Sequence, residues 1–183
     1  MPAGHGRARD GEDPSVSAMN EPVLTEQLLL CALRSRGMTF AAAESCTGGL
    51  IAKRITDLSG ASAVFRGGVV SYTNEVKHAV LGVPQTLLDT CGAVSAPVAR
   101  AMAEGARRIT GADLAVSVTG VAGPDRDDRG NEVGTVYIAL AHSGGTTDRL
   151  FHFHGDRAAI RSDAADAAFR LLMQHINENQ PTD

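Results

Sequence analysis

The chain has 183 residues and a formal net charge of −4, with 17 basic against 21 acidic side chains. That length suits one compact domain, and a hydrophobic share of 43% is enough to fill its core. The excess of acidic side chains argues against a protein that coats nucleic acid, but it allows a small anionic substrate. No apolar run is long enough to span a membrane. The three cysteines form no CxxC pair and cannot all form disulfides, which favours a reduced, cytoplasmic protein.

Composition divides the chain into one domain with two tails. Residues 1–19 are rich in Gly, Pro and charge and lack an apolar period, which predicts a disordered tail. We expect a single domain over residues 20–179 and a short C-terminal tail at 180–183. Within the domain, hydrophobic periodicity and Gly or Pro boundaries predict helices over 21–37, 47–60, 74–83, 84–92, 95–111 and 156–178, and strands over 38–44, 62–73, 113–123, 134–142 and 147–155.

The order of these elements predicts an α/β fold. Strands and helices alternate first, and a hairpin and a long helix follow. This pattern is typical of a three-layer α/β/α sandwich with a mixed, mostly parallel sheet.

Three polar segments follow predicted strands: "ESCTGG" at 44–49, "SYTNEVK" at 71–77 and "TGVAGP" at 119–124. Ligands of open α/β sheets gather beyond the carboxyl ends of strands, so these segments are candidates for one site. Each also has a simpler interpretation: Ser45 or Thr47 caps a helix, Lys77 is a solvated charge, and the third segment is a tight turn. Only the combination of the three favours a functional site.

Several blocks in order, among them "ESCTGGLIAKRIT", "GASAVFRGGVVSYTNEVKHAVLGV" and "ITGADLAVSVTGVAGP", closely resemble the C-terminal domain of the competence/damage-inducible CinA proteins. The likeness runs from about residue 24 to about residue 174. The family includes nicotinamide-nucleotide amidohydrolases, which convert nicotinamide mononucleotide and water to nicotinate mononucleotide and ammonia. The resemblance therefore implies that reaction in NAD salvage, a five-stranded sheet, no cofactor, and a homo-oligomer, most often a dimer.

The resemblance also implies a serine/lysine hydrolase, whose catalytic residues fall on Ser45, Lys77 and Tyr72. The chemistry of these side chains agrees with that assignment. A serine hydroxyl needs a base to remove its proton, and a lysine can act as that base if burial keeps its amine neutral. Cys46 is the rival nucleophile, since a helix N-terminus lowers a thiol pKa; the family pattern favours Ser45. We expect backbone N–H groups between Cys46 and Gly49 to form the oxyanion hole.

The substrate phosphate needs a local anion site. Thr119 and Gly120 could form a backbone nest, and Arg157 could add a bidentate contact. Arg161, one turn later, is a weaker candidate, and either arginine could instead pair with Asp156 or Asp163. The candidate substrate-binding residues are therefore Glu44, Cys46, Thr47, Gly48, Gly49, Thr119, Gly120 and Arg157.

Two further patterns suggest metals but fit them poorly. The loop "DRDDRGNE" at 125–132 departs from the family's glycine-rich turn, yet Arg129 and Val136 stand where an EF-hand needs oxygen ligands. His152 and His154 share a strand face without a clear third ligand. We expect no metal and a solvated loop.

A second hypothesis places the protein in another functional class, that of binding proteins without catalytic activity. Because relatives are linked to competence and DNA damage, the chain could be a catalytically silent module that binds a nucleotide or a partner. Otherwise we expect a small pyridine nucleotide as partner, with no nucleic acid and no membrane.

Overall fold

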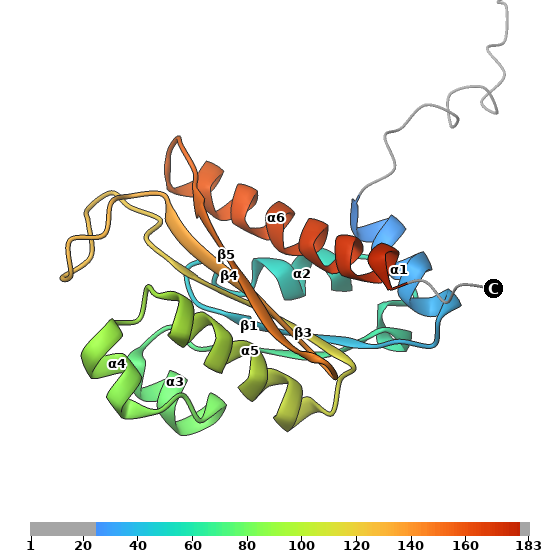
Figure 1. Cartoon of the computed structure of the whole chain (residues 1–183). Helices are drawn as coiled ribbons and strands as arrows, with labels where there is room; N and C mark the ends of the chain where they lie inside the picture. The colour runs from blue at the N-terminus through green and yellow to red at the C-terminus, as the bar shows by residue number, and fades with distance from the viewer. Residues whose placement is uncertain (1–24, 180–183) are drawn as a thin grey trace, which may run out of the picture.

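The computed structural model describes residues 25–179, so the two predicted tails at 1–19 and 180–183 lie outside the described residues. Its centre is a five-stranded mixed sheet in the order β2-β1-β3-β4-β5 (Figure 1). The strands are β1 (Phe40–Glu44), β2 (Phe65–Val70), β3 (Leu114–Gly120), β4 (Thr135–His142) and β5 (Gly145–His152). The α/β class and the mixed sheet are as predicted. β1 pairs in parallel with β2 and β3, whereas β3–β4 and β4–β5 are antiparallel, so four strands run in the same direction and β4 runs against them.

Helices cover both faces of the sheet and give the three predicted layers. Figure 1 shows α1 (Thr25–Ser35), α2 (Leu50–Thr56) and α6 (Arg157–Glu178) on one face. On the other face lie α3 (Asn74–Leu81), α4 (Gln85–Cys91) and α5 (Ala96–Thr110). No helix within residues 25–179 is long and apolar enough to cross a membrane.

Small side chains on the central strand allow helices to pack on both of its faces. Ala41, Ala42 and Ala43 of β1 are fully buried, with Ala42 in the core beneath α6 and its two neighbours in the core beneath α5. Helix α5 also approaches α3 closely, because a Cβ on Gly105 would lie 2.1 Å from the Leu81 carbonyl oxygen. This close packing fixes α3, the helix that carries Lys77.

Helix boundaries differ from the predicted ones where local turns intervene. Helix α2 ends at Thr56 rather than Gly60, and a short 3-10 turn follows at Ala61–Ala63. Ser95 occupies the N-cap position of α5, but its hydroxyl donates to the Gly92 carbonyl and caps no helical N–H. Such interactions depend on how the connecting turn folds, which composition alone does not specify.

Candidate active site

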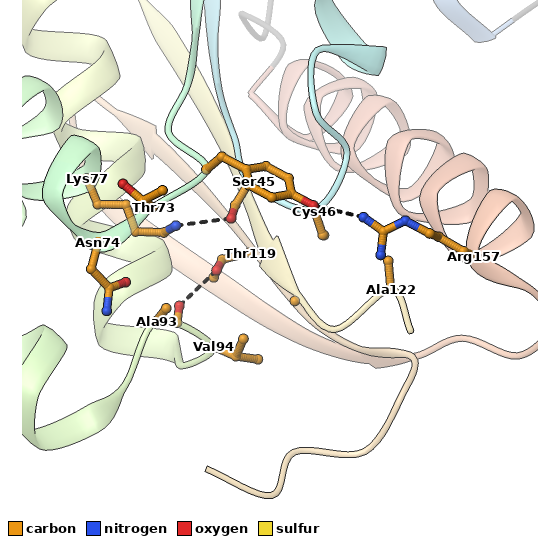
Figure 2. Close-up of a pocket in the computed structure, with 12 residues that line it drawn as sticks. Ser45, Cys46, Thr73, Asn74, Lys77, Ala93, Val94, Thr119, Ala122 and Arg157 are labelled. Atoms are coloured by element: carbon orange, nitrogen blue, oxygen red, sulfur yellow. Dashed lines mark hydrogen bonds between the residues drawn. The ribbon is translucent and has the colours of Figure 1, made fainter. Parts of the chain in front are cut away.

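The three polar segments meet at one edge of the sheet. Strands β2, β1 and β3 are neighbours and parallel, and Glu44 at the end of β1 is in register with Val70 and Val118. The residues that follow these positions surround a cavity of about 270 Å³ (Figure 2). Its lining residues are Ser45, Cys46, Tyr72, Thr73, Asn74, Lys77, Ala93, Val94, Thr119, Gly120, Ala122 and Arg157.

Ser45 and Lys77 form a buried contact inside this cavity. Lys77 Nζ lies 3.0 Å from Ser45 Oγ and donates a hydrogen bond to the Ser71 carbonyl oxygen at 2.8 Å. The Lys77 residue is 1% exposed. Burial lowers the pKa of Lys77 to about 8, although attraction to Cys46 and Glu75 opposes the shift. A lysine with this pKa supplies a neutral amine near physiological pH, as a general base requires.

Cys46 is held as a neutral thiol. It is 6% exposed, and burial raises its pKa to about 11 although its own backbone N–H, Lys77 and Arg161 all lower it. A thiol with that pKa carries almost no thiolate at neutral pH. The structure therefore favours Ser45 over Cys46 as the nucleophile.

Glu44 lies beneath the nucleophile turn, which we define as residues 45–49. Its carboxylate accepts hydrogen bonds from the backbone N–H groups of Gly49, Ile51 and Ala52 at 3.0, 3.1 and 2.9 Å. Neither Ser45 nor Thr47 caps α2. The chain instead reverses direction at Gly48 and Gly49, whose φ angles are +59° and +95°, and this reversal brings the first N–H groups of α2 next to Glu44. Glu44 thus contacts the helix terminus, and it does not line the cavity.

Most N–H groups of the nucleophile turn already have acceptors. Ser45 donates to the Val118 carbonyl, Gly48 to the Ser45 carbonyl and Gly49 to Glu44. Within residues 25–179, the N–H groups of Cys46 and Thr47 donate to no other residue. Thr47 is 0% exposed and does not line the cavity, whereas Cys46 does, so the predicted oxyanion hole narrows to the Cys46 N–H, which directly follows Ser45 in the chain.

Arg157 and Tyr72 meet at the mouth of the cavity. Arg157, the first residue of α6, donates to Tyr72 Oη at 2.8 Å and to the Gly123 carbonyl at 2.6 Å. No carboxylate lies within ion-pair distance of Arg157 among residues 25–179. Tyr72 is 56% exposed, and its hydroxyl contacts the arginine rather than Ser45 or Lys77.

Thr119 and Gly120 form the wall opposite Lys77. Thr119 is buried and donates to the Ala93 carbonyl at 2.8 Å, which joins β3 to the segment before α5. A Cβ on Gly120 would lie 2.6 Å from the Thr135 carbonyl oxygen, so only glycine fits at that position.

Several residues that line the cavity were not among the candidates predicted from the sequence. Thr73 and Asn74 stand inside the quoted "SYTNEVK" segment, which was the available signal for them. Ala93 and Val94 carry no chemical signal and reach the cavity only through the fold.

The remaining sequence candidates lie outside the cavity. Arg129 of the 125–132 loop donates to the carbonyls of Leu88 and Thr90 at the end of α4, so the loop is fastened to that helix. Within residues 25–179, no three His, Cys, Asp or Glu side chains are grouped closely enough to hold a metal ion.

Residues 24–176 match the CinA C-terminal domain family, and the chain belongs to that family. A CinA-like protein of Geobacter sulfurreducens is 54% identical over 143 residues, which are 78% of this chain and 35% of that protein. A putative competence-damage inducible protein of Symbiobacterium thermophilum is 50% identical over 153 residues, which cover 79% of this chain and 36% of that protein. The chain thus spans about a third of these relatives.

Solved structures agree with this assignment. A CinA superfamily protein from Klebsiella pneumoniae superposes with a TM-score of 0.82 at 32% identity, covering 85% of this chain and 99% of that one. The competence/damage inducible protein CihA from Agrobacterium tumefaciens gives 0.80 at 36% identity, covering 84% and 93%. The described fold is therefore that of the CinA superfamily.

Proposed function

We propose that the chain is an amidohydrolase that converts nicotinamide mononucleotide and water to nicotinate mononucleotide and ammonia. The observation that carries the proposal is the buried contact of 3.0 Å between Lys77 Nζ and Ser45 Oγ. A nucleophile and a base within hydrogen-bond reach, beside the backbone N–H of the cavity-lining Cys46, are the parts that acyl transfer requires. Family membership supports an amide of a pyridine nucleotide as the substrate.

In the acylation step, the neutral amine of Lys77 accepts the hydroxyl proton as Ser45 Oγ attacks the carboxamide carbon. The Ser71 carbonyl oxygen, 2.8 Å from Lys77 Nζ, accepts one amine hydrogen and leaves the nitrogen lone pair available to Ser45. The Cys46 N–H stabilises the oxyanion of the tetrahedral intermediate. The Lys77 ammonium then returns its proton to the amide nitrogen, which leaves as ammonia.

In the second step, water hydrolyses the ester on Ser45. Lys77 accepts a proton from the attacking water, and its return to Ser45 Oγ releases the carboxylate product. Arg157 lies at the mouth, 2.8 Å from Tyr72 Oη, where its guanidinium could hold the 5′-phosphate.

The test is ammonia release from nicotinamide mononucleotide by the purified chain, with Ser45→Ala as the matched variant. We expect steady turnover by the wild type and a loss of at least about 10⁴-fold in Ser45→Ala, with nucleotide binding retained. Tight nucleotide binding without turnover by the wild type would instead support the silent binding module. Equal activity of the two proteins would exclude Ser45 as the nucleophile.

A further inference from the structure

Arg161 contacts the carbonyl groups of the nucleophile turn, whereas Glu44 contacts N–H groups at its end and in α2. It stands on α6 one turn after Arg157, yet it points to different partners. Its Nε donates to the Cys46 carbonyl at 3.1 Å, and its Nη2 donates to the Thr47 carbonyl at 2.7 Å. The guanidinium lies close against the turn, because a Cβ on Gly48 would be 3.3 Å from Nη2. Arg161 does not line the cavity.

These two hydrogen bonds fix two consecutive peptide planes. In a trans peptide, the carbonyl and the N–H point in opposite directions. The hydrogen bond to the Cys46 carbonyl therefore orients the Thr47 N–H of the same peptide away from Arg161. The hydrogen bond to the Thr47 carbonyl orients the Gly48 N–H of the next peptide, and this N–H donates to the Ser45 carbonyl. The Ser45 carbonyl that accepts from Gly48 belongs to the same peptide as the Cys46 N–H and points the opposite way, so Arg161 acts through Gly48 on the direction of that cavity-lining donor.

The turn depends on such an external contact. Gly48 and Gly49 both have positive φ, and glycine allows many alternative backbone conformations. Among the described residues, the Cys46 carbonyl accepts a hydrogen bond from Arg161 alone. Without Arg161, the Cys46 carbonyl loses its donor and the Thr47 carbonyl keeps only the Leu50 N–H at 3.2 Å, so the Gly48–Ser45 contact that orients the Cys46 N–H is held less firmly.

We propose that Arg161 is a positioning residue that orients the Cys46 N–H, the donor of the oxyanion hole, by holding the Cys46 and Thr47 carbonyls, and that it therefore acts on the rate of acyl transfer, not on nucleotide affinity. The choice of substrate rests on the proposed function, whereas the effect on Ser45 reactivity does not. Losing one oxyanion donor typically lowers kcat by about 10²–10³-fold, so the effect is large enough to separate from a small structural change.

The kinetic experiment compares Arg161→Ala, Arg161→Lys and Arg157→Ala with the wild type, and uses the exposed α6 variant Arg170→Ala as a control. We expect Arg161→Ala to lower kcat about 100-fold, with KM changed less than about threefold and the pH midpoint unchanged. Arg161→Lys keeps the charge but cannot reach both carbonyls in a fixed fork, so it recovers part of the loss only. A raised KM with unchanged kcat would make Arg161 a substrate ligand and overturn the inference.

A second readout needs no nucleotide. A fluorophosphonate phosphonylates an activated serine through an oxyanion-stabilised step, and intact-mass measurement gives its rate at Ser45. We expect labelling about 100-fold slower in Arg161→Ala than in wild type, at equal melting temperature. If wild type is labelled but releases no ammonia, the proposed substrate fails and the Arg161 comparison still stands. Equal labelling rates, an unlabelled wild type, or loss of folding in both Arg161 variants would each overturn the positioning role.

Discussion

Lys77 is the residue on which the chemistry depends most, because its amine must lose a proton before it can accept one from Ser45. A free lysine has a pKa near about 10.4, so well under about a thousandth of it is neutral at pH 7. With the pKa lowered to about 8 by burial, roughly a tenth is neutral at that pH. Burial therefore supplies the base without any histidine in the cavity.

Turnover of nicotinamide mononucleotide should rise with pH through a midpoint near 8 and level off above it, since the neutral form of Lys77 is the active one. The measurement is kcat from pH 6 to 10. Lys77→Arg should be inactive across the range, because a guanidinium stays protonated. Activity that falls over pH 7–9, or wild-type turnover by Lys77→Arg, would remove Lys77 as the base.

Arg157 should contribute to the binding of the nucleotide substrate but not to the binding of the corresponding nucleoside. Its guanidinium lies at the mouth with no carboxylate partner in the described chain, so it is free to bind a phosphate. We expect Arg157→Ala to raise KM about 10–100-fold for nicotinamide mononucleotide and less than about threefold for nicotinamide riboside. Equal losses for both substrates would place the phosphate elsewhere.

Helix α2 illustrates what an element contributes to the site. Its first turn has no side-chain cap at Gly49, and the buried carboxylate of Glu44 satisfies three of its N–H groups instead. The same contacts hold the end of the nucleophile turn in place. The start of α2 and the position of Ser45 therefore depend on one side chain from β1.

Replacing Glu44 by Gln should destabilise the fold by about 2–3 kcal/mol, because one amide oxygen replaces a carboxylate that accepts three N–H groups. Urea unfolding measures the change in the free energy of unfolding. Lys53→Ala, which removes an exposed ion pair with Asp57 on the same helix, should cost less than about 1 kcal/mol. A Glu44→Gln cost no larger than that of the control would contradict the role of Glu44 as a helix cap.

Local sequence patterns predicted the elements and the Ser45 and Lys77 segments, because periodicity and strand-end position are local properties. They did not predict that Glu44 caps α2, since that contact requires the positive φ of Gly48 and Gly49. Nor did they predict that Arg161 holds the turn, because 115 positions separate it from Cys46. Contacts between distant segments, such as those of Arg161 with the Cys46 and Thr47 carbonyls, follow from the tertiary structure and have no local sequence signal.

At the scale of the whole molecule, the buried Lys77 of the candidate site lowers the free energy of unfolding. Lys77 is almost fully buried without a carboxylate partner in the described residues, so its charged form is disfavoured when the chain folds. Its folded pKa of about 8 lies below the usual 10.5, and the unfolded chain therefore binds more protons between these pH values. The contribution of Lys77 to stability therefore rises with pH over this window, and its penalty is largest below pH 8.

Lys77→Met should accordingly be more stable than wild type at pH 7, by about 1–3 kcal/mol after allowing for the lost hydrogen bond to the Ser71 carbonyl. The advantage should shrink toward zero near pH 10, because the wild type no longer carries a buried charge there. Urea unfolding at both pH values checks this. A variant that is less stable than wild type at pH 7, or an advantage that does not change with pH, would show that Lys77 is not strained.

The most direct measurement of the mechanism is the mass of the acyl-enzyme. Wild type mixed with nicotinamide mononucleotide is quenched in acid within milliseconds, digested, and analysed for a peptide that has gained the nicotinate mononucleotide acyl group. We expect this group on Ser45, unchanged in Cys46→Ala and absent in Ser45→Ala, since the Cys46 thiol with its pKa of about 11 stays protonated. An acyl group on Cys46, or steady ammonia release by Ser45→Ala, would contradict the serine mechanism.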